Sequence, residues 1–439
     1  MMSLLYNLFE DKLEMDHREP FPIFSLNQTT LPTFLRGNDE DDDNMISVGV
    51  VTPVGTFYAQ LLFLIIVQRI IAAFCSILIY NYIIVNSRHP QKTMSTTASF
   101  LIGFGVILPI MLQSPFWFVN VLDIRSKAMR LLLLSLPLTG TLRLLEAFFG
   151  FTPQEASSSL QNYMVYFTTL VDVEFDSKTQ KPIYATSQDL MLLSKQCFLS
   201  SLKLVVALCI FAPMSYTPFE TGVLAHSTNH TFADIWSWMH ILNNFVAATI
   251  LSFSLEFGSN NINLLIEITT GIKTKQMVNN PMFASTSVSD FWGSRWNNLI
   301  HVALKRGVYK PVRKYCNKRS IAAAATFLAS GILHEYCWGL LFYVHDNEKD
   351  YESGFCSNCV YPHYGKNVIF FGWNGVLIVF EYLLSQFYFV RKIRTKLPNI
   401  IITAMVLITA LPIGHLFTGD WVAAGYYEQI QMAFPMFII

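Results

Sequence analysis

The chain has 439 residues, of which 52% are hydrophobic and 14% are charged, with 30 Lys and Arg against 30 Asp and Glu. An ordinary soluble domain is about 25% charged, so this composition excludes a typical soluble enzyme and favours a polytopic membrane protein. Zero net charge also excludes a generally basic nucleic-acid binder and a supercharged disordered chain. Any functional charge must therefore be local.

Charge is concentrated in two segments of opposite sign. Residues 1–50 hold ten acids and three bases, whereas residues 258–320 hold ten bases and two acids. We predict an acidic, mobile N-terminal arm at 1–50 and one multi-span membrane domain at 51–439. The seven cysteines are scattered and suggest no disulfide framework. Cys356 and Cys359 form a CxxC pair, which we interpret as a loop pair, reduced or oxidised, because a zinc ribbon needs a second such pair.

Eight stretches are long and apolar enough to cross a bilayer, which takes about 20 residues. They are residues 54–85, 98–121, 131–151, 197–214, 235–257, 321–344, 368–390 and 398–417. The first is overlong and carries Gln68 and Arg69 near its middle, and the apolar tail after Trp421 is a candidate partial span. We therefore expect an all-α, polytopic transmembrane helix bundle of about eight or nine spans.

The loops predict an orientation, because an excess of Lys and Arg marks the cytoplasmic side. The basic loop that ends at Ser320 and residues 391–396 should be cytosolic, and the acidic loop 345–366 should face the lumen or exterior. Alternation puts the N-terminus outside too, and the two Asn-x-Ser/Thr sequons, at Asn27 and Asn229, fall on that side. Alternation also puts a short basic turn on this outer side, which disagrees with the rule that basic loops are cytoplasmic. The turn contains Arg125, Lys127 and Arg130.

An ionisable residue inside a span is costly and is by default a functional hypothesis. The stretch 321–344 carries His334 and Glu335 at its middle. From position alone, a satisfied hydrogen bond between helices explains such a residue equally well. The surrounding small residues favour a site, since they let a neighbouring backbone or a lipid chain approach closely. They are Ala322, Ala323, Ala324, Ala325, Ala329, Ser330 and Gly331.

Residues 290–298 read DFWGSRWNN and lie at the bilayer edge on the basic side. The aromatics can form an interfacial belt. The Asn297 amide can donate to a carbonyl oxygen as charge develops on it, or hold an imidazole in one tautomer. A cationic strip follows, made of Lys305, Arg306, Lys310, Arg313, Lys314, Lys318 and Arg319. Each base taken singly is explained as an anchor on the cytoplasmic side of the membrane. As a group, the bases suit binding of a carrier with several phosphates at the cytosolic opening of a site.

The sequence SDFWGSRWNNLIHVALKRGVYKPVRKY, followed after a short interval by FLASGILHEY, resembles the paired signature of the membrane-bound O-acyltransferase family. The wax synthase-like branch is the most similar. The motif core at 290–336 covers about a tenth of the chain. The resemblance implies a multi-helix fold in which an acyl-CoA enters from the cytosol and a lipid hydroxyl enters from the membrane. We expect a multi-pass protein of the endoplasmic reticulum membrane.

The resemblance carries the catalytic histidine of the family onto His334 and its motif asparagine onto Asn297. Trp292, Arg295 and Trp296 are motif neighbours, and with Lys305, Arg306 and Arg313 of the cationic strip they are the candidate substrate-binding residues. Ser294 departs from the pattern, since the wax synthase-like branch commonly has a basic residue there. This departure puts in doubt how closely the site fits the CoA carrier or the acceptor alcohol of that branch.

We predict an acyl-CoA-dependent O-acyltransferase whose acceptor is a long-chain fatty alcohol, giving a wax ester, or alternatively a sterol, terpenoid or diacylglycerol. In this hypothesis His334 takes the alcohol proton, and Asn297 polarises the thioester carbonyl or orients the imidazole. Direct transfer is favoured because no Cys or Ser lies beside His334 in a nucleophile motif. We expect acyl-CoA as co-substrate, no metal, no further cofactor and no nucleic-acid partner, and leave the oligomeric state open.

Other interpretations have weaker support. His334 and Glu335 begin like a zincin helix, but Trp338 stands where the second metal ligand would be. His415 and Asp420 fit an H-x4-D spacing that arises easily by chance. Glu381 lies in a predicted span, where it could pair across helices or line an acyl tunnel. The alternative from another class is a transporter, supported by buried polar groups but by no internal symmetry: Arg69, Glu146, His240, His334, Glu335, Glu381.

Overall fold

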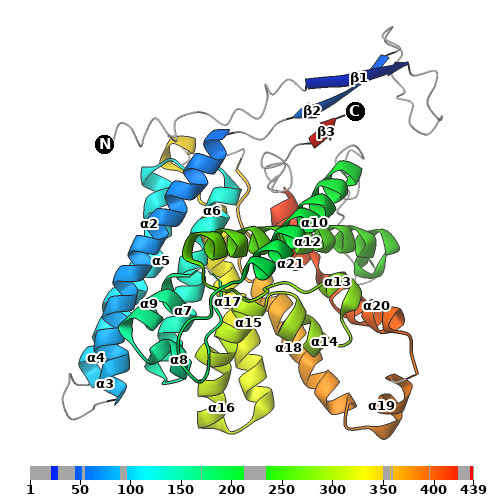
Figure 1. The fold of residues 1–439 in the computed structure, drawn as a ribbon. Coiled ribbons are helices and arrows are strands. Elements are labelled where there is room, and N and C mark those ends of the chain that lie inside the picture. The colour runs from blue at the N-terminus through cyan, green and yellow to red at the C-terminus, as the bar shows by residue number, and fades with distance from the viewer. Residues whose placement is uncertain are drawn as a thin grey trace.

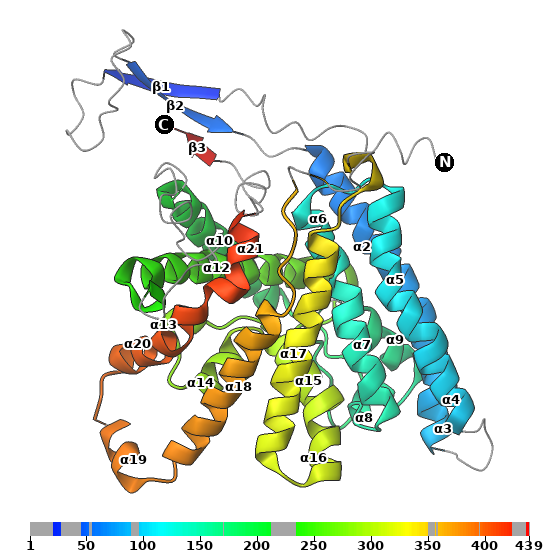
Figure 2. The same ribbon diagram turned by 180° about the vertical axis from the view of Figure 1, so that it is seen from behind.

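The computed structural model describes residues 21–27, 45–51, 55–88, 96–169, 171–211, 234–349, 356, 359–394, 396–423 and 436–438. Within these residues the chain folds almost entirely into helices, packed as a bundle with a small sheet at one end (Figures 1 and 2). The predicted all-α class is confirmed. The division into an arm at 1–50 and a domain at 51–439 stays a prediction, because most of the arm lies outside the described residues.

The first part of the bundle begins with α2 (Gly55–Ile79). Its outward face repeats large apolar side chains every four residues, at Leu62, Ile66, Ile70 and Phe74, and each is at least 50% exposed. An exposed apolar stripe of this kind is typical of a helix that meets lipid. The chain continues through η4 (Tyr80–Ile84), α3 (Val85–Arg88), α4 (Thr96–Ile102), η5 (Gly103–Ile107), α5 (Leu108–Val121), α6 (Lys127–Leu133), α7 (Ser135–Phe148), α8 (Gln154–Ser157) and α9 (Leu160–Thr168).

The middle of the chain forms two long helices that pack on each other, α10 (Ser187–Phe211) and α12 (Trp238–Thr270), with η7 (Asp234–Trp236) before the second. Lys203 on α10 and Glu256 on α12 form an ion pair at 2.9 Å. The helix α12 ends at Gly271, whose φ of 70° gives the left-handed C-cap that glycine adopts without strain.

The motif segment folds into short helices that lead into two long ones. The close approach of the long pair, α17 (Arg319–Leu341) and α18 (Lys366–Leu384), depends on Gly331, where a Cβ would lie 2.8 Å from the Cα of Val368. The elements are α13 (Pro281–Ala284), α14 (Val288–Asp290), η8 (Phe291–Arg295), α15 (Asn298–Leu304), η9 (Lys305–Tyr309), α16 (Lys310–Cys316), α17 (Arg319–Leu341), η10 (Asp346–Glu348) and α18 (Lys366–Leu384).

The last part consists of α19 (Tyr388–Arg394), α20 (Asn399–Ala410), η11 (Leu411–Ile413) and α21 (His415–Ala423). The chain bends by 63° between the segments Asn399–Ile413 and His415–Trp421. This bend turns α21 back toward α12 and α18, against which it packs.

A three-stranded antiparallel sheet joins the two ends of the chain. The central strand β2 (Met45–Val51) pairs with β1 (Phe21–Asn27) on one side and with β3 (Met436–Ile438) on the other. The composition did not predict this sheet, which lies outside the helix bundle in Figure 1.

The number of candidate spans among the described residues is close to the sequence prediction. Six described helical segments are long and apolar enough to cross a membrane, and the bent pair of the last part provides a seventh. α17 corresponds to the predicted span at 321–344 and has 23 residues, but its polar centre at His334 and Glu335 lowers its hydropathy. The described residues therefore give six or seven candidate spans, against the eight or nine expected.

The two predicted cytosolic segments lie at one end of the molecule. α16, which ends in the basic loop before Ser320, and α19, which contains residues 391–394, both lie at the bottom of Figure 1. The acidic segment at η10 and the strands β1 and β2 lie at the opposite end. Asn229 lies outside the described residues.

The basic turn that disagreed with the orientation is neutralised by local contacts. Arg125 pairs with Asp123 at 3.1 Å and with Glu348 at 3.7 Å. Arg130 is buried and donates to the carbonyl oxygens of Leu341 and Tyr343 at 3.0 and 2.7 Å. A cation at the C-terminal end of a helix, here α17, interacts favourably with the helix dipole. Arg125 is therefore paired at the surface, and Arg130 is part of the packing.

Candidate functional site

His334 lies near the middle of α17, and the contacts of its ring fix its tautomer. Nδ1 is 2.7 Å from the carbonyl oxygen of Ser330. A carbonyl oxygen can only accept, so Nδ1 carries the proton and Nε2 keeps a lone pair. Among the described residues Nε2 has no hydrogen-bond partner. The imidazole is thus prepared to accept a proton at Nε2.

Aromatic rings surround the His334 imidazole. The ring of Phe371, from α18, lies at a centroid distance of 4.3 Å, and that of Phe417, from α21, lies at 5.3 Å. Both phenylalanines are buried. The imidazole is partly buried, and these two neighbours are apolar, so neither competes for the lone pair of Nε2.

Glu335 follows His334 in sequence but performs a different task. Its Oε1 accepts hydrogen bonds from the backbone N–H groups of Asn367 and Val368, at 3.0 and 3.2 Å. These N–H groups belong to the first turn of α18, where a carboxylate is favoured by the helix dipole. Glu335 therefore links α17 to the start of α18, which is a structural role.

An apolar cavity lies next to the aromatic rings around His334. Its volume is about 50 Å³. Residues from α12, α13, α14, η8, α18, α20, η11 and α21 line it, among them Trp292, Trp296, Phe370 and Phe417. The lining residues include no ionisable side chain. The cavity thus suits an uncharged hydrocarbon.

Two of the predicted substrate-binding residues, Trp292 and Trp296, line this cavity. Trp292 Nε1 donates to Oδ1 of Asn374 on α18 at 3.0 Å, and its ring contacts Phe371 at 5.6 Å. The amide of Asn374 in turn donates to the Phe370 carbonyl at 2.8 Å. The indole of Trp292 is therefore fixed on α18, one aromatic ring away from His334.

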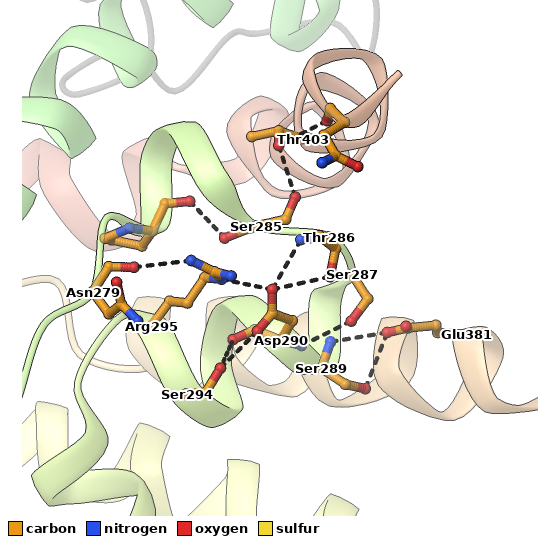
Figure 3. Close-up of polar contacts among 12 residues, drawn as sticks. Asn279, Ser285, Thr286, Ser287, Ser289, Asp290, Ser294, Arg295, Glu381 and Thr403 are labelled. Carbon is orange, nitrogen blue, oxygen red and sulfur yellow. Dashed lines mark hydrogen bonds and ion pairs between the residues drawn. The ribbon is translucent and has the colours of Figure 1, made fainter. Parts of the chain in front are cut away.

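Asp290 organises the loop that carries these tryptophans (Figure 3). Its Oδ2 accepts from Arg295 Nε at 2.6 Å and from Thr286 N and Oγ1 at 3.0 and 3.1 Å, while Oδ1 accepts from Ser294 Oγ at 2.6 Å. Burial raises the pKa of the Asp290 carboxyl, but these hydrogen bonds outweigh burial and lower its pKa to about 2. Asp290 is thus ionised at neutral pH and pairs with Arg295.

The same loop is tied to two long helices (Figure 3). Glu381 on α18 accepts from Ser289 N and Oγ at 2.9 and 3.0 Å. Thr403 on α20 donates to the Ser285 carbonyl at 2.8 Å. Of the two roles considered for Glu381, these contacts support pairing across elements.

Asn297 is the N-cap of α15. Its Oδ1 accepts a hydrogen bond from Ile300 N at 3.2 Å, which satisfies one of the free N–H groups at the helix start. The Nδ2 group has no partner among the described residues and so keeps its donors. Ile300 and Leu333, which precedes His334, pack in the same apolar cluster. No hydrogen bond between described residues joins Asn297 directly to His334.

The four predicted cationic residues do not form one group. Arg295 is used by Asp290 and by the Asn279 carbonyl at 3.3 Å. Arg306 is half-buried and donates to the Tyr166 hydroxyl at 3.4 Å. Arg313 donates to Asn317 at 2.7 Å, and Lys305 is exposed. Lys305 and Arg313 therefore remain near the surface, whereas Arg306 joins an internal cluster with Tyr166 and Glu146.

Several residues of the His334 surroundings and of the cavity were not predicted as site residues. Phe370, Phe371 and Asn374 come from α18, where Asn374 follows the two phenylalanines by four and three positions, and Phe417 comes from α21. The helical spacing within α18 is a usable signal, but it does not tell which neighbouring helix the side chains face. The approach of α21 depends on the bend after η11, which the sequence marks only by Pro412 and Gly414.

Asp420 forms a second buried polar centre. Its carboxylate accepts from Trp338 Nε1 at 3.2 Å, from Lys366 Nζ at 3.2 Å and from His363 N at 3.2 Å, and contacts His363 Nδ1 at 3.1 Å. His415 instead lies beside His240, at a centroid distance of 5.0 Å. The two members of the H-x4-D spacing therefore belong to separate environments.

The remaining predictions concern cysteines and metals. Cys356 and Cys359 are joined by a disulfide, which resolves the open choice between reduced and oxidised. Among the described residues, no group of three or more His, Cys, Asp or Glu side chains is arranged to hold a metal ion.

Comparison with known proteins agrees with the motif. Residues 275–351 match the model of the membrane bound O-acyl transferase family. "Probable long-chain-alcohol O-fatty-acyltransferase 9" of Arabidopsis thaliana is 25% identical over 209 residues, covering 44% of this chain and 55% of that protein. "Probable long-chain-alcohol O-fatty-acyltransferase 6" of the same plant is 37% identical over 114 residues, covering 23% and 32%.

A further relative is "Acyl-CoA--sterol O-acyltransferase 1" of Arabidopsis thaliana, 32% identical over 91 residues, or 18% of this chain and 26% of that protein. The chain spans about half the length, or less, of these curated relatives. The family match includes both His334 and Asn297.

Proposed function

Because the chain belongs to the membrane-bound O-acyltransferase family, we propose that it transfers a fatty acyl group from acyl-CoA to the hydroxyl of a long-chain fatty alcohol. The product is a wax ester. The observation that carries this proposal is the His334 imidazole, with Nδ1 fixed on the Ser330 carbonyl, Nε2 free and an apolar cavity one ring away. No cofactor besides the acyl-CoA substrate is required.

The reaction needs little activation, because a thioester is already reactive and the enzyme must bring it to the alcohol and remove one proton. In the proposed step, His334 Nε2 takes the hydroxyl proton as the alcohol oxygen attacks the thioester carbonyl. A C–O bond forms, the C–S bond breaks, and the proton passes to the departing CoA sulfur. The aromatic surroundings of His334 exclude water and so limit hydrolysis of the acyl donor.

Asn297 has a donor to offer in this step. Its Oδ1 is held by Ile300 N, which fixes the orientation of the amide and leaves the Nδ2 hydrogens available. A preorganised amide donor stabilises negative charge on a carbonyl oxygen during acyl transfer. We assign Asn297 to the thioester carbonyl, with the alternative of an indirect role in orienting the imidazole.

The carrier phosphates are assigned to the cytosolic end, where Lys305, Arg313 and the rest of the strip lie. Trp292 and Trp296 are assigned to the apolar part of a substrate because they line the cavity. Arg295 is assigned a supporting role through Asp290, since its guanidinium is already paired. We propose the endoplasmic reticulum as the membrane in which this chemistry takes place.

A sterol is the second candidate acceptor, because one relative is named as a sterol acyltransferase. A test of both uses membranes that express the protein, labelled acyl-CoA and a panel of alcohols. We expect labelled ester with a long-chain alcohol from the wild-type protein and none above background from His334→Ala at equal protein level. No ester with any acceptor would refute acyl transfer and favour a transport function.

A further inference from the structure

One aromatic ring belongs both to the apolar cavity and to the surroundings of His334. Phe417 lines the cavity and lies 5.3 Å from the imidazole, centroid to centroid. Phe370 lines the cavity too, and stacks on Phe417 at 5.2 Å with 11° between the ring planes. Phe417 therefore lies between the cavity and the histidine, with Phe370 stacked on it, and these two rings are called the partition below.

Neighbouring aromatic rings hold Phe417 in place. Its ring also contacts Phe371 at 5.6 Å and Trp338 at 5.8 Å, and the side chain is buried. Edge-to-face and offset-stacked pairs at such distances are stabilising. Turning the ring aside would break all these contacts at once, so the partition has a fixed width.

The cavity suits the uncharged partner of the reaction. Its polar lining side chains are Asn244, Asn374, Thr409 and Thr418, and none is ionisable. The cationic residues follow on η9 and α16, which pack against α17 away from α18 (Figure 2). The phosphates of a carrier would bind near those cations, whereas the hydrocarbon of the alcohol acceptor can lie in the cavity.

We propose that Phe417 is a specificity-determining residue that selects acceptor alcohols by the width of the acceptor molecule. A hydroxyl at His334 Nε2 with its hydrocarbon in the cavity has to pass beside the Phe417 ring. A passage bounded by fixed rings admits an unbranched chain more readily than a fused ring system. This inference rests on the proposed acyl transfer and adds that a linear alcohol is preferred to a sterol.

The test compares kcat/KM for hexadecanol and for cholesterol, with one acyl-CoA, in the wild-type protein and in Phe417→Ala. Fitting or misfitting a single methylene changes kcat/KM by about 10- to 200-fold. We therefore expect the wild-type preference for hexadecanol to fall at least about 10-fold in Phe417→Ala. Phe417→Leu should reduce the preference less, and it replaces Phe417→Ala if that variant is not folded.

The control is Phe342→Leu. Phe342 is as buried as Phe417 and packs on Trp338 at 6.1 Å, but it does not line the cavity. Its alcohol preference should remain that of the wild type. A second series varies acyl-CoA length with hexadecanol fixed, and should be unchanged in the Phe417 variants.

An unchanged alcohol preference in an active Phe417 variant would overturn the inference, as would a shift confined to the acyl-CoA series. A wild-type protein that prefers cholesterol would also overturn it while leaving acyl transfer intact. In contrast, a wild-type protein that esterifies no alcohol would refute the proposed function itself, and the inference with it.

Discussion

His334 and Asp420 are both enclosed by the same aromatic cluster, yet their hydrogen bonds differ in kind. Both oxygens of Asp420 are used, by Trp338, His363 and Lys366. One ring nitrogen of His334 forms a hydrogen bond within its own helix, and the other forms none among the described residues. A buried polar residue whose atoms are all paired holds helices together, whereas one with an unused atom beside a cavity is placed for chemistry.

The neighbouring residues His334 and Glu335 differ in which helix their hydrogen bonds reach. Glu335 bonds to two N–H groups of α18 and so joins two helices. The side chain of His334 makes its hydrogen bond within α17. If this distinction is right, substitutions at His334 should affect turnover, and substitutions at the paired acids should affect stability.

The largest expected effect is on turnover in His334→Ala. A positioned general base contributes about 10²- to 10⁴-fold, so turnover per folded molecule should fall by that factor. Labelled ester formation at matched protein level measures it. His363→Ala is the control, since it removes the histidine beside Asp420 and should leave turnover near that of the wild type. Near wild-type turnover in His334→Ala would dismiss the assignment.

Two variants can separate the two functions of Asn297, which are helix capping and hydrogen-bond donation from the amide. Asp is as good an N-cap as Asn, so Asn297→Asp keeps the bond to Ile300 N but loses the amide donor. Removing one such donor costs about 10²- to 10³-fold in kcat. We expect this loss in Asn297→Asp with an unchanged melting temperature, and the same loss plus about 1 kcal/mol of stability in Asn297→Ala.

Esterification rates and thermal unfolding in detergent measure the two effects in parallel. If Asn297→Asp turned over like the wild type, Asn297 would be only a helix cap. Capping alone would then explain why this residue type stands at the start of α15.

Asp420→Asn should reduce stability more than activity. Lys366 has 20% of its side chain exposed and would lose its partner carboxylate, 3.2 Å away. Breaking a buried ion pair from one side costs about 3–5 kcal/mol, and partial exposure favours the lower end. Thermal unfolding measures this loss. The control is Asp346→Asn, which breaks an exposed pair with Lys349 and should cost much less stability, because solvent screens an exposed pair. Equal losses in the two variants would contradict a structural centre at Asp420.

The sequence predicted the fold class, most of the candidate membrane-spanning helices and the placement of His334 on a long helix. Those predictions follow from hydropathy and from a local motif. The aromatic ring of Phe417 lies more than 80 positions from His334 in the chain, and its contact depends on the bend before α21. No local pattern contains that information, because tertiary packing decides it.

Charge gave weaker predictions than hydropathy for a similar reason. Arg306 counts as one of a row of cations in the sequence, but the fold turns it toward Tyr166. Arg130 counts as a loop charge, but it contacts the end of α17. A base acts as a free charge only when no carboxylate, hydroxyl or carbonyl lies within reach, and that depends on elements distant in sequence.

The smallest expected effect concerns acid and the loop of Asp290. The usual pKa of an aspartate is about 3.9, and hydrogen bonds lower that of Asp290 to about 2 in the folded protein. A lowered folded pKa means that the ionised carboxylate stabilises the fold above about pH 4, by about 2 kcal/mol, and that this contribution disappears as pH falls toward 2. The melting temperature of the wild type should therefore exceed that of Asp290→Asn at pH 7, and the difference should shrink between pH 4 and pH 2. A difference that stays constant over this range would show that the Asp290 charge contributes nothing, and that neutral hydrogen bonds alone hold the tryptophans against α18.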